Sequence, residues 1–184
     1  YYILILIFFV VLDFCLTNIY KNIKEIQVGD LRSEHPIFHH NLKPNSEGGG
    51  YISEKYYTNS LGFRDFATRD ISNKTEKKRI LLMGDSFTLG AKTEYIDTYA
   101  GKIINYFEKK NIEVLNGAVT SYSPIIYFTK IKFLIEKKKL EFDELYLFID
   151  ISDTFDDVYR YKINSEGNVV NSDQRIKKKE FINS

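Results

Sequence analysis

The sequence predicts an α/β fold in which helices cover both faces of a parallel sheet. Two observations support this prediction. Between Arg79 and Ile151, short apolar runs alternate with longer segments whose apolar residues recur at helical spacing. The resulting order of strand, helix, strand, helix, strand is typical of right-handed βαβ units. We therefore expect a three-layer α/β domain over residues 79–184.

The first strand is expected at the apolar run Ile80–Met83, which Gly84 ends. A short, continuous apolar run is typical of a strand that is buried on both faces. A helix is expected soon after Gly84. Thr98 to Lys110 carries apolar residues at broadly helical spacing and closes with basic residues, which suit the C-terminus of a helix.

The second strand is expected at Glu113–Leu115, and Pro124 should open the next helix, because proline is favoured at the first helical position. Apolar residues recur at intervals of three and four until Lys137. The third strand is expected at Leu145–Ile151, and the segment Tyr159–Val170 has the composition of an appended hairpin.

Residues 21–78 form a loop-rich lead-in that contains Pro36, Pro44 and three consecutive glycines at 48–50. Several aromatic residues accompany them, which indicates a segment packed on the neighbouring domain rather than a free linker. The polar stretch Asn73–Lys78 marks the expected boundary with the α/β domain.

The N-terminal segment is apolar without interruption from Tyr1 to Leu12, and the run resumes after Asp13. It falls slightly short of the about 20 apolar residues that a bilayer-crossing helix needs. We expect residues 1–20 to be part of a transmembrane or signal-anchor helix. We also expect the chain to be truncated, with the α/β domain incomplete at its C-terminus. A buried core helix and a signal-peptide core stay open as alternatives.

Composition excludes several classes of function. Twenty-six basic and 25 acidic residues give a formal net charge of +1, which offers no electrostatic basis for a nucleic-acid partner. Cys15 is the only cysteine, so neither a disulfide framework nor a thiolate metal cluster can form. The sequence also lacks a glycine-rich loop followed by Lys and Ser or Thr, which argues against a phosphate-binding domain.

The candidate chemistry lies where the first strand ends, because reactive groups in a parallel sheet gather at the carboxyl ends of its strands. Gly84 and Asp85 precede Ser86, so the Ser86 hydroxyl is expected at a junction of strand and helix. A helix N-terminus stabilises negative charge, and the Ser86 amide can contribute to an oxyanion hole. Asp and Ser also cap helices without any catalytic role, and that alternative stays open.

The segment Arg79–Gly90 resembles the first block of the SGNH (GDSL-like) hydrolases, in which a Gly-Asp-Ser turn presents the nucleophile. Val114–Pro124 is similar to the second block, with Ser121 where the family usually has an oxyanion-hole glycine. Asp150–Asp153 stands at the third block, with Ser152 at the position of the family's asparagine. The resemblance implies a three-layer, flavodoxin-like sheet and requires no cofactor.

By this resemblance the protein is expected to be a serine esterase or O-acyltransferase of the cell envelope, anchored in the membrane by its N-terminal helix. Its substrate would be an ester or an acylated cell-surface glycan. Because Ser121 and Ser152 depart from the family pattern, a catalytically inactive binding or assembly module stays open as the alternative. The expected site consists of Ser86 as nucleophile, Ser121 and Ser152 in the oxyanion hole, and Asp85, Asn116 and Asp153 in support.

The family's general base is a histidine near the C-terminus of the domain, but no histidine follows Ser86 here. We expect it beyond Ser184. A base supplied from upstream is the alternative, because the order of a catalytic triad differs between folds. The three candidates for that role are His35, His39 and His40.

Two further expectations concern charged side chains. Arg64 lies in a stretch that resembles a lead-in of membrane-attached family members, and we expect it to pair with an acidic group. A cluster of aspartates after the third strand offers a hard-cation site as an alternative function, although the glycine and glutamate of a calcium loop are absent. These aspartates are Asp150, Asp153, Asp156 and Asp157.

Overall fold

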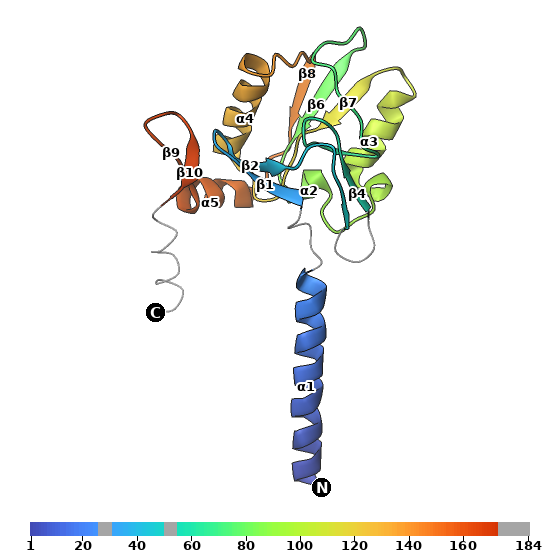
Figure 1. Ribbon diagram of the computed structural model, residues 1–184, viewed down its shortest axis with the longest axis vertical. Coiled ribbons are helices and arrows are strands. Elements are labelled where there is room, and N and C mark those ends of the chain that lie inside the picture. Colours follow the sequence, from blue (N-terminus) through green and yellow to red (C-terminus); the bar gives the residue numbers. More distant parts are fainter. Residues whose placement is uncertain (26–30, 50–54, 173–184) are drawn as a thin grey trace.

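The computed structural model describes residues 1–25, 31–49 and 55–172. It shows a mixed α/β fold around a six-stranded sheet with the strand order β3-β4-β5-β7-β6-β8 (Figure 1). The three strands predicted from the sequence lie together, with β6 central and parallel to both β7 and β8. The strands of the sheet are β3 (Glu47–Gly49), β4 (Lys55–Thr58), β5 (Arg64–Asp65), β6 (Arg79–Met83), β7 (Glu113–Asn116) and β8 (Glu144–Leu147).

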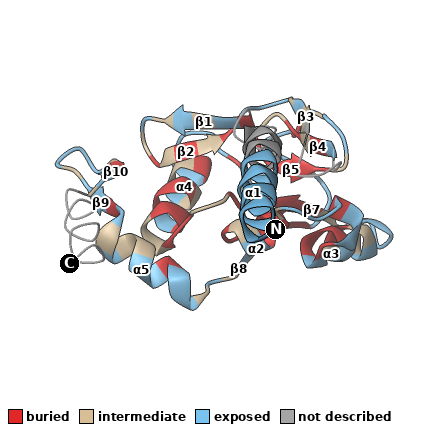
Figure 2. Ribbon diagram, turned by 90° about the horizontal axis from the view of Figure 1, so that it is seen from below, coloured by how far each residue is buried: buried red, intermediate tan, exposed pale blue. Residues whose placement is uncertain are grey.

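Strand β6 is buried on both faces, as its apolar run predicts. Leu81 and Met83 belong to the core cluster that contains residues of α4, whereas Ile80 and Leu82 belong to the cluster that contains residues of α3. The two helices lie on opposite sides of the sheet in Figure 2. The helices are α1 (Tyr2–Glu25), α2 (Ser86–Leu89), α3 (Tyr99–Glu108), α4 (Pro124–Glu136) and α5 (Ile151–Tyr159), with a 3₁₀ turn at Tyr95–Asp97.

The prediction of an entirely parallel sheet is wrong, because the loop-rich lead-in contributes strands β3, β4 and β5. Each of these pairs antiparallel with its neighbour, and Arg64 of β5 lies opposite Asn116 of β7. The pattern of β4 places Tyr56 and Thr58 inside. Strands of two to four residues are too short to give a periodic signal in the sequence.

The third predicted strand is too long at its C-terminal end. Strand β8 ends at Leu147, and helix α5 begins at Ile151. Asp150 and Asp153 form a reciprocal capping box there, in which each side chain accepts a hydrogen bond from the other residue's backbone. Because of this cap, the chain starts a helix at the end of the apolar run that was predicted to be a single strand.

Two hairpins stand beside the sheet. The hairpin predicted over Tyr159–Val170 is present as strands β9 (Tyr161–Ile163) and β10 (Val169–Asn171). The lead-in forms the second hairpin, from β1 (Arg32–His35) and β2 (His39–Leu42). The amide of Val169 donates to the carbonyl of Ile37 at 2.8 Å, so the two hairpins are joined although they lie far apart in the sequence.

Helix α1 is exposed over residues 2–17 (Figure 2), and its side chains there are largely apolar. A helix therefore forms where the sequence predicts one. In the parts of the chain that the structure describes, no helix has both the length and the apolar character needed to cross a bilayer.

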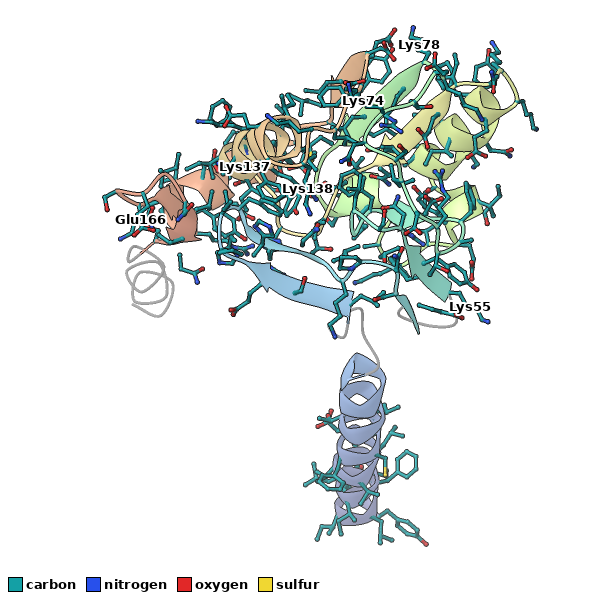
Figure 3. The ribbon with its side chains drawn as sticks, turned by 45° about the horizontal axis from the view of Figure 1, so that its top comes forward. Lys55, Lys74, Lys78, Lys137, Lys138 and Glu166 are labelled. Atoms are coloured by element: carbon teal, nitrogen blue, oxygen red, sulfur yellow. The ribbon has the colours of Figure 1, made fainter. Side chains whose placement is uncertain are left out.

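The side chains of Lys74 and Lys78 lie near one another at one end of the sheet (Figure 3). Lys78 directly precedes β6 and forms an ion pair with Glu144, and Lys74 pairs with Glu141 at 2.7 Å. Exposed ion pairs of this kind contribute little to stability, typically about 0–1 kcal/mol. These ion pairs therefore lie at the surface of the protein.

Candidate functional site

The turn between β6 and α2 requires glycine at position 84. A β-carbon there would lie 2.0 Å from the Thr88 hydroxyl oxygen and 3.1 Å from the Phe148 carbonyl oxygen. Helix α2 can therefore fold back on the strand only because Gly84 has no side chain. This close approach places Ser86 at the first position of α2, where it is half-buried.

Asp85 fixes the start of α2. One carboxylate oxygen accepts a hydrogen bond from the Phe87 amide at 2.9 Å, which is an N-cap. The other accepts a hydrogen bond from the Ser86 hydroxyl at 3.1 Å. The structure thus combines the two interpretations of this motif, because Asp85 caps the helix and also contacts the candidate nucleophile.

Arg64 holds the other end of α2. Its Nη1 donates to the carbonyl oxygens of Leu89 and Gly90 at 2.8 and 2.5 Å, and Nη2 donates to that of Thr93 at 2.9 Å. Carbonyl oxygens, rather than the expected acidic group, accept these hydrogen bonds. The guanidinium lies 3.7 Å from the ring centroid of Tyr56. A buried cation at the C-terminus of a helix is favoured by the helix dipole, so Arg64 fixes the position of α2.

Replacing Arg64 with lysine is expected to lower the free energy of unfolding by about 1–3 kcal/mol, because one ammonium cannot serve three carbonyl oxygens in the geometry of a guanidinium. Urea denaturation followed by circular dichroism measures the change. Arg160→Lys is the matched control, since Arg160 makes a partly exposed ion pair with Asp156. Equal stability of Arg64→Lys and the wild type would show that these hydrogen bonds do not hold α2.

Asn116 connects the end of β7 to α2. Its side-chain amide donates to the Thr88 carbonyl at 2.9 Å, and its oxygen accepts from the Ala118 amide at 3.2 Å. Asn116 is buried, so the bond to α2 is shielded from water. The residue predicted to support Ser86 therefore contacts the same short helix.

The Ser121 loop, residues 117–123, follows β7. Ser121 has a φ of 63°, the left-handed conformation that glycine adopts most easily. The amide of Val119 donates to the Gly84 carbonyl at 3.4 Å, so the loop lies beside the Ser86 turn. Ser121 thus adopts a conformation typical of glycine, at the position where the SGNH hydrolases, which the sequence resembles, usually have glycine.

Asp150–Asp153, the segment that resembles the third block, forms the N-terminus of α5. Both the amide and the hydroxyl of Ser152 donate to the same carboxylate oxygen of Asp150 at 2.5 Å, and Ser152 is exposed. Its hydroxyl proton is therefore engaged in the helix cap. Asp153 is buried and accepts a hydrogen bond from the Tyr127 hydroxyl at 2.8 Å.

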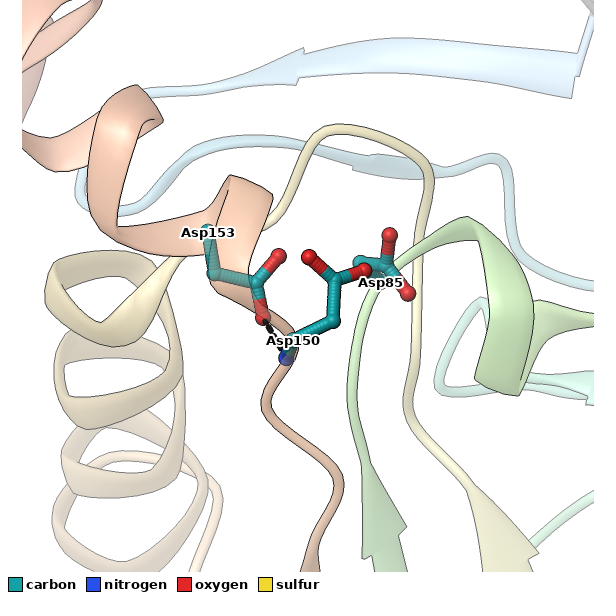
Figure 4. A group of neighbouring side chains, drawn as sticks. All are labelled: Asp85, Asp150 and Asp153. Carbon is teal, nitrogen blue, oxygen red and sulfur yellow. Dashed lines mark hydrogen bonds between the residues drawn. The ribbon is translucent and has the colours of Figure 1, made fainter.

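Three carboxylates meet between β6 and α5 (Figure 4). Asp85, Asp150 and Asp153 each place an oxygen within 4.8 Å of the others. Burial is the main cause that raises the pKa of Asp153, and the charges of Asp85 and Asp150 act in the same direction. Hydrogen bonds from Ser152 are the main cause that lowers the pKa of Asp150.

Such a cluster can hold a shared proton or a hard cation. Asp150 and Asp153 are among the aspartates that the sequence suggested, whereas Asp156 and Asp157 lie outside the cluster. Asp156 instead pairs with Arg160, and Asp157 accepts a hydrogen bond from the Ile125 amide at 3.2 Å, so both serve to fix α5. Asp85 comes from a different strand end, which the sequence spacing could not reveal.

Asp153→Asn is expected to flatten the pH dependence of stability. Because the pKa of Asp153 is raised in the fold, its contribution to stability is fully present below the unfolded pKa and is lost as pH rises through the folded pKa. Asparagine stays neutral and keeps an acceptor for Tyr127. Urea midpoints between about pH 4 and pH 7 should therefore fall less in Asp153→Asn than in the wild type. Asp97→Asn, an exposed control, should follow the wild type; identical curves for Asp153→Asn would contradict the raised pKa.

The three histidines lie in the β1–β2 hairpin. His35 stacks on Phe38 with ring centroids 3.5 Å apart, and burial lowers its pKa to about 4. His39 and His40 contact one another and segments that follow Ser86 in the sequence. None of the three is hydrogen-bonded to Ser86 among the described residues, so the structure gives no support to an upstream base.

No family model matches the sequence, and no curated protein is significantly similar to it. Sequence reasoning missed Tyr127 and Tyr161, which contact Asp153 and the Ser121 carbonyl. Tyr127 stands between Ile126 and Phe128 in the sequence, and nothing in this local pattern indicates a contact with Asp153.

Proposed function

We propose that the protein is a serine esterase or O-acyltransferase of the SGNH (GDSL-like) type, with Ser86 as the nucleophile. One observation carries the proposal. Ser86 begins a helix immediately after the central, fully buried parallel strand, at a turn where only glycine fits at position 84. This arrangement directs a hydroxyl and a helix N-terminus to the same place, which suits attack on an ester carbonyl.

In the proposed reaction the Ser86 oxygen attacks the carbonyl carbon of an ester and forms an acyl-enzyme as the alcohol leaves. The backbone amides of Ser86 and Ser121 stabilise the oxyanion, with a polar contribution from Ser152 once its hydroxyl turns away from Asp150. A general base accepts the serine proton and returns it to the leaving alcohol. Water or a sugar hydroxyl then takes the acyl group. No cofactor is required.

The strand order β7-β6-β8, with α3 and α4 on opposite faces, supports a flavodoxin-like three-layer arrangement for the parallel part of the sheet. The exposed apolar side chains of α1 support attachment to a membrane through the N-terminus. By the resemblance to membrane-attached SGNH proteins, we propose an extracytoplasmic domain at the cell envelope, whose substrate is an O-acetylated cell-surface glycan.

The proposal is tested by incubating the full-length protein with O-acetylated oligosaccharides and with unacetylated acceptors. Mass spectrometry separates free acetate from acetyl groups that have moved to an acceptor. Loss of substrate ester groups by either route supports the proposal, and the product distinguishes hydrolysis from transfer. Binding of the oligosaccharide without any loss of ester would contradict it and favour the inactive binding module, for which the engagement of the Ser152 hydroxyl in a helix cap is the specific observation.

A further inference from the structure

The left-handed conformation of Ser121 needs support from its surroundings. For a residue with a β-carbon this conformation costs roughly 1–2 kcal/mol, and it persists only where neighbouring groups hold it. The Tyr161 hydroxyl donates to the Ser121 carbonyl at 2.9 Å. Further support acts on the residues on both sides of Ser121, and it comes from the lead-in.

His40 contacts the loop on both sides of Ser121. Its Nε2 lies 2.9 Å from the Thr120 carbonyl oxygen, and the Tyr122 hydroxyl donates to the His40 carbonyl at 2.8 Å. The His40 ring also packs edge-to-face on Tyr122, with centroids 4.9 Å apart. A residue of strand β2 thus holds residues 120 and 122 at a fixed separation.

The hydrogen-bond network defines the tautomer of His40. A carbonyl oxygen only accepts, so the proton must reside on Nε2, and Nδ1 faces Nδ1 of His39 at 2.8 Å as the acceptor. His40 is 1% exposed, and burial lowers its pKa to about 3. The ring is therefore neutral near pH 7 and presents one donor to the loop.

Lys130 of α4 joins the same two segments. Its ammonium donates to the Gly117 carbonyl, the Tyr122 hydroxyl and the side-chain oxygen of Asn41, each at 2.9 Å. Asn41 follows His40 in β2, so a second contact binds this strand to the loop. The anchoring of the loop thus depends on the lead-in hairpin rather than on the α/β core alone.

We infer that His40 is a positioning residue, which acts from strand β2 to hold Ser121 in the left-handed conformation that aims its amide at the reacting carbonyl. The inference rests on the proposed function for its catalytic consequence. It makes the β1–β2 hairpin part of the site, although none of its side chains is hydrogen-bonded to Ser86 among the described residues.

The test compares three variants of the full-length protein. His40→Phe keeps a ring of similar size but removes the donor to Thr120. His40→Gln keeps a donor at nearly the same place. His35→Phe is the matched control, because it makes the same substitution in the same hairpin. It removes the hydrogen bonds that His35 Nδ1 accepts from the Ile37 and Phe38 amides at the turn, but none to the Ser121 loop. Two quantities are measured: amide hydrogen exchange in residues 119–123 and the rate at which a fluorophosphonate labels Ser86.

His40→Phe is expected to speed exchange in the loop and to slow labelling by at least about tenfold, since a displaced oxyanion donor weakens catalysis steeply. His40→Gln should restore most of the slow amide exchange and most of the labelling rate. His35→Phe should match the wild type in both measurements. If His40→Phe unfolds the protein, His40→Met takes its place with the same expectations.

Unchanged exchange and labelling in His40→Phe would overturn the inference, and so would equal impairment in His40→Gln, because a general loss of packing would then explain both. A wild-type protein that is not labelled would instead refute the proposed function. The exchange data would still decide whether His40 holds the loop.

Discussion

Replacing Ser86 with alanine is expected to lower ester turnover by at least about 10³-fold, because the acyl-enzyme can no longer form. Stability should change little, since Ser86 is half-buried and its side chain makes one hydrogen bond within the described part of the chain, to Asp85. Turnover of p-nitrophenyl acetate and the urea midpoint measure the two effects on the same preparation. The combination separates loss of a nucleophile from loss of the fold.

Ser123→Ala provides the matched control for Ser86→Ala. Ser123 is buried at the start of α4, and its hydroxyl oxygen has no hydrogen-bond partner among the described residues. Removing a hydroxyl that makes no bond is expected to leave turnover unchanged within about threefold and stability unchanged or slightly increased. Turnover that survives in Ser86→Ala at the level of Ser123→Ala would exclude Ser86 as the nucleophile.

Replacing Lys130 with methionine is expected to lower the free energy of unfolding by about 3 kcal/mol, because two buried acceptors and the half-buried Asn41 oxygen lose their donor. The loss exceeds the gain from removing a buried charge, since the ammonium is satisfied by all three acceptors and faces the ring of Phe63 at 4.8 Å. Burial lowers the pKa of Lys130, which reflects the cost of the charge. Urea denaturation followed by fluorescence measures the balance.

Lys132→Met is the control for this substitution, because Lys132 lies on the same helix and is exposed. Its effect on the free energy of unfolding is expected to stay within about 0.5 kcal/mol. Should Lys130→Met prove as stable as the wild type, the three acceptors would need no ammonium, and the anchoring of the Ser121 loop by α4 would be wrong.

Elements with long periodic patterns could be predicted from the sequence. Strand β6 was evident from four consecutive apolar residues, and α4 from its proline start and its regular apolar spacing. Strand β5 has two residues and depends on pairing with β4 and β7, so no local pattern announces it. The sequence does not predict helix α5, because the apolar run that forms β8 continues to Ile149 and hides the point where the strand ends. The capping box of Asp150 and Asp153 starts the helix there.

In the candidate site, too, local contacts could be predicted from the sequence and contacts between distant residues could not. Asp85 and Ser86 are adjacent in the chain, so their contact follows from the local turn. The contacts that support the site join residues far apart in sequence: 26 positions for Tyr127 and Asp153, and 80 for His40 and Thr120. Such pairs depend on how the helices and hairpins pack, and a single sequence holds no signal for them.

The most direct test of the account is the reaction of the folded, full-length protein with a fluorophosphonate probe, followed by mass spectrometry of the labelled peptide. An activated serine is expected to react, whereas an ordinary capping serine is not. The account predicts one labelled peptide that contains Ser86, with no labelling in Ser86→Ala. A folded protein that remains unlabelled, or a label that persists in Ser86→Ala, would contradict the assignment of Ser86 as the nucleophile.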